Sequence, residues 1–251
     1  MEANKNEIDS DVLQSPVLEI ADFDAGRDFP QFEDDYIQRY NPLYVTCKIP
    51  AEQIQDVHRL EENGFRFLEF QMRLRGALNK DYQVPGADYS YLPVNVDQDL
   101  PAVLDIASSI FEHDRYSRDP FFERFAQRNI AGERYRRYVQ KSAEADNEFV
   151  YKLVNHRSGE IVAFGTHRIL APDQALLLIG GVKNEYKASG LGVINDRLGL
   201  NELRRKGVKW FYTHVSAANY PIINLEVRGL GFRVVRGFVV LRKVYQPRPQ
   251  D

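Results

Sequence analysis

The stretch "KASGLG" at residues 187–192 has the residue types of an anion-binding turn. It follows the nearly unbroken apolar run "DQALLLIGGV" and is closely followed by residues with helical periodicity. Backbone N–H groups at the start of a helix lack an intrahelical partner and lie at the positive end of its dipole, and glycine lets an anion approach the backbone closely. Gly190 and Gly192 therefore predict a cradle for a pyrophosphate, with a simple tight turn between strand and helix as the alternative.

The same residues argue against two other phosphate-binding loops. The sequence contains no G-x-x-x-x-G-K-[ST] segment. A G-x-G-x-x-G loop that began at Gly190 would need a glycine where Asn195 stands. The sequence therefore predicts neither a P-loop nor a Rossmann nucleotide site.

Two side chains further along the sequence have the chemistry for proton transfer. His214 stands near the end of the expected strand "VKWFYTHV", and imidazole titrates close to neutral pH. Tyr220 follows Asn219, the expected N-cap of a helix with Pro221 in its first turn. Each has a structural alternative, because a lone strand histidine commonly serves packing and a tyrosine can pack beside a helix start.

These residues need a sheet and helices to position them. Residues 95–247 predict the order helix, helix, strand, strand, strand, helix, strand, helix, strand. The strand at 174–182 is apolar almost throughout, which indicates burial on both faces. The helix after it ends at Gly207, in the favoured position beyond a helix C-terminus. We therefore expect an α/β domain over 95–247, preceded by a linker at 81–94.

A smaller unit precedes this linker. Residues 44–75 predict strand, helix and strand, and the sequence "GFR" at 64–66 recurs at 231–233. In both places the glycine can take the left-handed conformation that ends a helix. The recurrence has two interpretations, an internal repeat or a common local solution. We assign residues 1–80 to one small α/β unit. Its first 40 residues are acidic and weakly periodic, and the stretch "EANKNEIDSD" at residues 2–11 predicts a frayed terminus.

Composition and net charge argue against two classes of partner, nucleic acid and membrane. The chain has 251 residues, of which 43% are hydrophobic, and a formal net charge of −3. This charge gives no long-range attraction to nucleic acid or to an anionic membrane, and no block of lysines and arginines resembles a polyanion-binding tail. No apolar run approaches the ~20 residues that span a bilayer. We expect neither nucleic acid nor membrane as a partner.

Cysteine usage and the first residues predict a compartment. Cys47 is the sole cysteine, so an internal disulfide is excluded. The acidic first residues have neither the basic nor the apolar region of a signal peptide. We therefore expect a soluble, cytoplasmic protein. No cluster of His, Cys and Asp has metal-ligand spacing, so we expect no metal.

The loop and the order of elements together resemble the GNAT acyltransferase superfamily over residues 95–245. Its pyrophosphate-binding signature, R/Q-x-x-G-x-G/A, matches Lys187, Gly190 and Gly192, with lysine replacing the usual arginine or glutamine. The segment "SAANYPIINLEVRGLGF" resembles the family's N-x-x-A-x-x-L-Y-x-x-x-G-F segment, which begins here at Asn219. The resemblance implies a mixed, mostly antiparallel twisted sheet flanked by helices, with acetyl-CoA as acyl donor.

The resemblance also implies where acetyl-CoA binds. If the strand that ends at Val182 separates from its neighbour "FYTHV", its exposed main-chain groups can pair with the pantetheine amides like an added strand. The pyrophosphate then lies on the loop and the helix start. The implied binding residues are Gly180, Gly181, Val182, Lys187, Ala188, Ser189, Gly190, Leu191, Gly192, Val193 and Asn219.

The proton donor is the point where this sequence departs from the family pattern. In the family, the tyrosine of the L-Y pair often protonates the departing thiolate. Counting forward from Asn219 puts Glu226 in its place, but counting backward from the G-F pair puts Val227 there, because the segment is one residue longer. Glu226, His214 and Tyr220 are the catalytic candidates. Departure of the thiolate without an acid, and binding of acyl-CoA without turnover, stay open.

A closer resemblance is to the TDP-fucosamine acetyltransferase branch. It rests on the segment "HDRYSRDPFFERFAQRNIAGERYRRYVQKSA" and on the strand-helix-GF-strand unit, which in that branch is similar to a truncated copy of the acyltransferase end. It implies that residues 44–75 are a degenerate partial copy. It also implies that the acceptor is the amine of a nucleotide-linked, dTDP-linked amino deoxy sugar for a surface polysaccharide, which attacks acetyl-CoA directly in a ternary complex.

Other acceptors and another function class remain as alternatives. The acceptor could instead be an amino acid, a peptide or an antibiotic amine. The chain could also be a non-catalytic acyl-CoA-binding module. A homodimer is left open.

Overall fold

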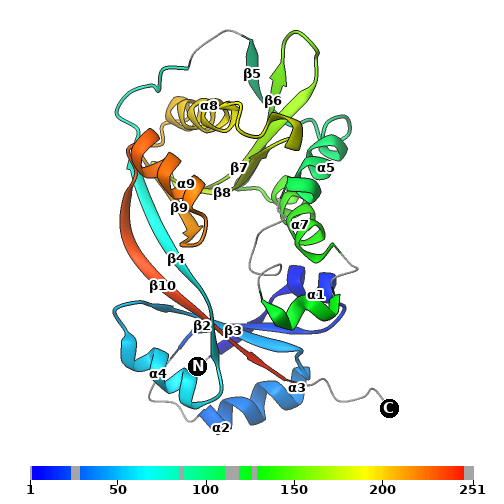
Figure 1. Cartoon of the computed structure of the whole chain (residues 1–251), viewed down its shortest axis with the longest axis vertical. Helices are drawn as coiled ribbons and strands as arrows, with labels where there is room; N and C mark the ends of the chain where they lie inside the picture. The colour runs from blue at the N-terminus through cyan, green and yellow to red at the C-terminus, as the bar shows by residue number, and fades with distance from the viewer. Residues whose placement is uncertain (1, 24–28, 85–87, 111–118, 126–128, 246–251) are drawn as a thin grey trace. The chain divides into compact units, whose positions relative to one another are not determined.

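The computed structural model describes residues 2–23, 29–84, 88–110, 119–125 and 129–245 (Figure 1). The chain divides into two compact units. Unit 1 comprises residues 1–72, 216–218 and 236–251, and unit 2 comprises residues 73–215 and 219–235. The glycine loop and the three catalytic candidates all lie in unit 2.

Unit 1 is a sheet with short helices. Its elements are β1 (Glu2–Lys5), α1 (Glu7–Leu13), β2 (Val17–Asp22), α2 (Phe29–Phe32), the π-helix η1 (Glu33–Ile37), α3 (Gln38–Tyr40), β3 (Tyr44–Pro50), α4 (Ile54–Glu62), the first part of β4 (Arg66–Ala77) and most of β10 (Arg233–Val244). The strand order is β1-β2-β3-β10-β4, with β2 parallel to β3 and β3 antiparallel to β10. Thus β10 separates β3 from β4 in this unit.

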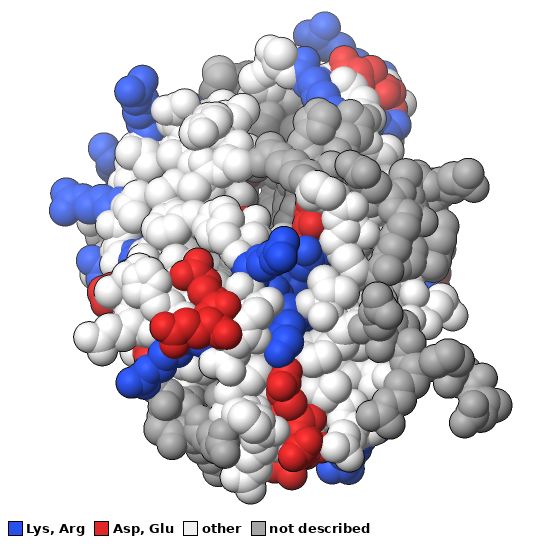
Figure 2. Space-filling view, turned by 60° about the horizontal axis from the view of Figure 1, so that its bottom comes forward, with Lys and Arg blue, Asp and Glu red and all other residues white. Residues whose placement is uncertain are grey.

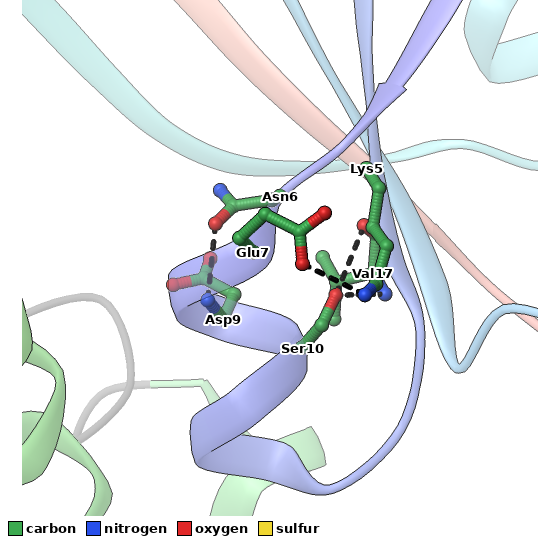
Figure 3. A network of polar contacts seen from close by, with 6 residues as sticks. All are labelled: Lys5, Asn6, Glu7, Asp9, Ser10 and Val17. Carbon is green, nitrogen blue, oxygen red and sulfur yellow. Dashed lines mark hydrogen bonds and ion pairs between the residues drawn. The ribbon is translucent and has the colours of Figure 1, made fainter.

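The first residues of unit 1 form regular elements, so the prediction of a frayed terminus is wrong. The side chain of Asn6 accepts the N–H of Asp9 at 3.0 Å and caps α1, while the Ser10 hydroxyl accepts the N–H of Val17 at 2.9 Å (Figure 3). The apolar side chains of α1 are buried, namely Ile8, Val12 and Leu13. Tertiary packing therefore stabilises a seven-residue helix that is too short to form alone.

Unit 2 holds the second sheet region. Its further elements are β5 (Tyr89–Pro93), α5 (Leu100–Ile110), the 3₁₀-helix η2 (Pro120–Phe125), α7 (Ile130–Glu144), β6 (Glu148–Asn155), β7 (Ile161–Ala171), β8 (Gln174–Val182), the 3₁₀-helix η3 (Asn184–Tyr186), α8 (Leu191–Arg205), β9 (Trp210–Ser216), α9 (Tyr220–Asn224) and the π-helix η4 (Leu225–Gly229). The strand order is β4-β9-β8-β7-β6-β5. The neighbours from β5 to β8 pair antiparallel, and β8 pairs parallel with β9.

The order of elements after residue 95 follows the prediction, from two helices to the final strand β10. Residues 89–93, within the segment expected to be a linker, form β5 and pair with β6. Part of the helical segment that supported the closer resemblance, residues 111–118 and 126–128, lies outside the described residues.

Helices cover both faces of the unit 2 sheet. On the α5 face, Val103 belongs to one buried cluster with Val150 of β6 and Phe164 of β7. On the opposite, α8 face, Leu191 clusters with Leu153 and Ala163. Among the helices in the described ranges, none combines the length and the hydropathy needed to cross a bilayer.

The "GFR" phrase has the same local structure at both of its occurrences. Gly64 and Gly231 have φ values of 83° and 76°, and the phenylalanine after each is buried. The N–H of Phe65 donates to Leu60 at 3.0 Å, and the N–H of Phe232 donates to Glu226 at 2.9 Å. Each strand-helix-strand segment also starts with a strand parallel to its predecessor, β2–β3 and β8–β9. The two hydrogen bonds reach back five and six residues respectively, so the two turns are similar but not identical, and both interpretations of the recurrence stay open.

Charges of both signs are mixed on the surface. Figure 2 shows lysines and arginines next to aspartates and glutamates in small groups on one face of the molecule. This distribution agrees with the low net charge of −3.

Candidate functional site

The parallel strands β8 and β9 part in the middle of the unit 2 sheet. Their pairing runs from Gln174 opposite Trp210 to Leu177 opposite Thr213 and then stops, although β8 continues to Val182. From there on, no strand of the described residues pairs with the β9-facing edge of β8. The main-chain groups of this edge are those that an extended ligand can use as an added strand.

A bulge in β8 lies at the point where the strands part. Gly165 of β7 faces Gly180, but His167 faces Leu177, so β8 has one extra residue between these pairs. The Thr166 hydroxyl fixes the bulge, because it accepts the N–H of Ile179 at 2.9 Å and donates to the carbonyl of Ile179 at 2.8 Å. A bulge bends the strand and changes the direction of its main-chain groups.

The loop after β8 matches an anion cradle. Gly190 is the N-cap of α8 with φ of 84°, and a Cβ added there would meet no atom within 4 Å. Ala188 has φ of 62°, although it is not a glycine. Within the described part of the chain, the N–H groups of Ala188, Gly190 and Gly192 donate to no acceptor. Lys187 is exposed beside them.

The remaining loop residues support the turn. The Ser189 hydroxyl donates to the carbonyl of Tyr186 at 2.6 Å and accepts the N–H of Leu191 at 3.3 Å. Leu191 is buried, and the N–H of Val193 bonds back to the Gly190 carbonyl at 3.1 Å. The structure therefore brings residues 187–193 into one tight turn at the start of a fifteen-residue helix.

The glycines at the end of β8 have a packing reason. A Cβ at Gly180 would lie 3.1 Å from the Phe164 carbonyl oxygen, and a Cβ at Gly181 would lie 2.0 Å from Cδ1 of Ile110 in α5. Val182 packs against the cluster on the α8 face. The two glycines thus let β7 and α5 approach β8 closely. This packing reason is independent of the main-chain groups that β8 offers to a ligand.

The segment after Asn219 contains the extra residue that made the count ambiguous. The side chain of Asn219 accepts the N–H of Ile222 at 3.5 Å, so α9 starts there as predicted. The next turn is the π-helix η4, in which the N–H of Leu230 donates to Leu225, five residues back, at 3.0 Å. A π-helix accommodates one extra residue. Both Glu226 and Val227 lie in this π-helix, and of the two only Glu226 is an acid.

Glu226 is a buried carboxyl group. It is 7% exposed, and in the described structure its Oε2 atom is buried without a hydrogen-bond partner. Burial first, and the nearby Asp196 carboxylate second, raise the pKa of Glu226 to about 8. Burial also raises the pKa of Asp196 in α8 to about 7. Glu226 therefore carries a proton at neutral pH.

The other two catalytic candidates are exposed. His214 directly follows Thr213, the last residue of β9 that pairs with β8, so it stands where the two strands part. Tyr220 is 69% exposed at the first residue of α9. Exposure and position leave His214 as a group that an acceptor could reach.

Sequence reasoning missed a buried polar cluster under α8. The Tyr91 hydroxyl lies 3.5 Å from Nε2 of His167, and Asn195 donates to the Phe164 carbonyl at 3.1 Å. Burial lowers the pKa of His167 to about 4. A Cβ at Gly199 would lie 3.0 Å from the Tyr91 hydroxyl. That glycine, inside a helix, was the one sequence signal of a close contact.

The fold is shared with solved acetyltransferase structures. No protein-family model matches the sequence, and the curated proteins contain no match to it either. A GCN5-related N-acetyltransferase from Sphaerobacter thermophilus superposes with a TM-score of 0.67 at 16% identity, over 98% of this chain and 76% of that one. A tandem GNAT protein from the clavulanic acid biosynthesis pathway gives 0.65 at 15% identity, over 94% and 77%.

A third solved structure has a named acceptor. It is a GCN5-related glucosamine N-acetyltransferase region in a fungal multi-domain GH3 β-N-acetylglucosaminidase, with a TM-score of 0.62 at 11% identity, over 91% of this chain and 30% of that one. These likenesses confirm the predicted fold class, a mixed and mostly antiparallel sheet flanked by helices. The chain has the fold of the GCN5-related N-acetyltransferases.

Proposed function

We propose that the chain is an N-acetyltransferase that moves the acetyl group of acetyl-CoA to an amine. The observation that carries this proposal is the open turn at residues 187–192, which follows directly on the strand that parts from β9. Three N–H groups without partners among the described residues, and the empty space at Gly190, fit a pyrophosphate. The unpaired edge of β8 fits the amides of a pantetheine arm.

The geometry supports distinct roles for the chain's own residues. The loop and Lys187 hold the pyrophosphate, and β8 orients the arm so that the thioester lies where the strands part. The acceptor amine attacks the carbonyl carbon, a C–N bond forms and the C–S bond breaks. Glu226, protonated at neutral pH, gives the sulfur a proton and regains one released by the amine.

We propose an amino sugar as the acceptor, carried on a nucleotide. The resemblance to sugar acetyltransferases in the two-unit arrangement supports it. The fungal region with the same fold is a glucosamine N-acetyltransferase by its description. An amino acid, peptide or antibiotic amine is the second candidate, since the tandem GNAT protein comes from a pathway to a small molecule.

Release of free CoA tests the proposal. The chain is mixed with acetyl-CoA and a thiol reagent, against nucleotide-linked amino sugars, free amino sugars and amino acids. Cys47 adds little background, because it is 1% exposed and burial raises its pKa to about 12. Release with a nucleotide-linked amine alone supports the full proposal. Silence with every amine, while CoA binds, identifies a non-catalytic acyl-CoA-binding module.

His214→Ala is expected to lower kcat about a hundredfold and leave the CoA dissociation constant unchanged. His214 lies where the strands part, and as a base it removes the proton from the acceptor ammonium group. His58→Ala is the matched control, because His58 is an exposed histidine on α4 of unit 1. Full activity of the His214 variant across a pH series would remove this residue from the mechanism.

A further inference from the structure

The α5 face of the unit 2 sheet presents two arginines stacked on aromatic rings. The guanidinium carbon of Arg73 on β4 lies 4.4 Å from the ring centroid of Tyr212 on β9, and that of Arg75 lies 4.8 Å from the ring of Trp210. Both rings are two residues apart on β9, so they share a face. Tyr212 is opposite Leu176, whereas its neighbour Phe211 packs on Phe232 on the other face.

Arg73 has no counter-charge. Its Nε atom is buried, and among the described residues it has neither a hydrogen bond nor a carboxylate within ion-pair distance. Other arginines of this unit are paired, such as Arg168 with Glu148 at 2.5 Å and Arg204 with Asp81 at 3.0 Å. Stacking on Tyr212 does not satisfy the in-plane donors of the guanidinium, and this planar set of donors suits a carboxylate or phosphate.

The position of this pair relates it to the reaction. Tyr212 is next to Thr213, the last residue of β9 that pairs with β8, and His214 is the next side chain on the same face as Tyr212. Tyr212 and His214 are two residues apart on the strand, which corresponds to about 6.6 Å. An anion bound to Arg73 and an amine at His214 can therefore belong to the same small molecule. The glycine loop lies at the start of α8, on the other face of this sheet.

We propose that Arg73, stacked on Tyr212, binds an anionic group of the acceptor, with Arg75 as a second contact. The acetylated amine therefore belongs to a negatively charged molecule. Two guanidinium groups on one face suit a doubly charged group such as a diphosphate better than a single carboxylate. This inference rests on the proposed function and specifies its substrate class.

The first test compares an acceptor that carries an anionic group with one that lacks it. Arg73→Met keeps an apolar side chain on Tyr212 and removes the charge. It is expected to raise KM for a dTDP-linked amino sugar at least tenfold, and to leave KM for the free amino sugar and the CoA dissociation constant unchanged. Arg66→Met, an exposed arginine on the same strand, is the control. An equal loss with both acceptors would show a structural role and overturn the inference.

A second test needs no turnover, so it separates this inference from the proposed function. Binding of dTDP and of glutarate is measured by calorimetry with saturating CoA, which occupies the glycine loop. If Arg73→Met binds either ligand at least tenfold more weakly than wild type, the anion site is supported. The ligand whose binding is weakened shows whether the site prefers a phosphate or a carboxylate. Equal binding of both ligands by wild type and variant, or no binding by wild type, overturns it. If Arg73→Met does not fold, Arg73→Lys is measured instead. It must bind the ligand more weakly than wild type, by a smaller factor than is expected for Arg73→Met.

Discussion

Gly190→Val is expected to weaken CoA binding about a hundredfold. The valine side chain enters the space at the start of α8 in which the structure has no atom within 4 Å, and which the pyrophosphate is proposed to fill. It also blocks access to the N–H groups of the turn. Loss of one charge-assisted hydrogen bond costs about 1.5–3 kcal/mol, or roughly one to two powers of ten in the dissociation constant. Calorimetry with CoA measures the effect.

The other end of the same helix supplies the control. Gly207 has φ of 89°, close to the 84° of Gly190, and a Cβ there also meets no atom within 4 Å. Gly207→Val therefore has the same backbone strain, about 1–3 kcal/mol, at a site far from the loop in sequence. We expect equal losses of thermal stability in the two variants and a loss of CoA binding in Gly190→Val alone. Unchanged CoA affinity in Gly190→Val would reject the cradle.

Glu226→Gln is expected to lower kcat by about two to four powers of ten and to remove the fall in rate at high pH. With a pKa of about 8, Glu226 donates a proton below that pH and loses it above. The wild-type rate should therefore decline as the pH rises through about 8, whereas the low rate of an amide variant should not. Glu144→Gln is the control, because Glu144 is an exposed glutamate at the end of α7.

The same substitution has an opposite effect on stability. A carboxyl group whose pKa is raised on folding contributes stability fully below its ordinary pKa of 4.5, and this is lost as the pH rises through about 8. Glu226→Gln should therefore be more stable than wild type at pH 9, on the order of a few kcal/mol, and should lose this advantage near pH 4. Chemical denaturation at the two pH values measures it. Equal stability of wild type and Glu226→Gln at pH 9 would show that the Glu226 carboxylate is solvated and not buried.

The sequence allowed the loop and its surroundings to be predicted because their signals are local. Glycine spacing, an apolar strand and a helix start within residues 174–193 are read without knowledge of distant contacts. The choice between Glu226 and Val227 could not be made in this way. The extra residue lies in η4 with its i to i+5 hydrogen bonds, and two counts of the same residues fit the sequence equally.

The features that the sequence did not predict depend on packing between distant residues. Residues 2–11 predicted a frayed terminus because the stretch is short of apolar residues and acidic, and their order comes from burial in unit 1. No local pattern marked Asp196, whose pKa is raised to about 7 by burial in unit 2. The stacking of Arg73 on Tyr212 requires the pairing of β4 beside β9, which no local pattern shows.

The position of β10 has a consequence for how the chain is made. This last strand lies between β3 and β4 in unit 1, so the sheet of the first-synthesised unit is incomplete until the ribosome has released residues 233–244. Until then β3 has an exposed edge, which is the kind of edge that pairs with other chains. Nascent chains should therefore need protection from aggregation until β10 has been synthesised, and a truncation at residue 232 should accumulate as insoluble protein.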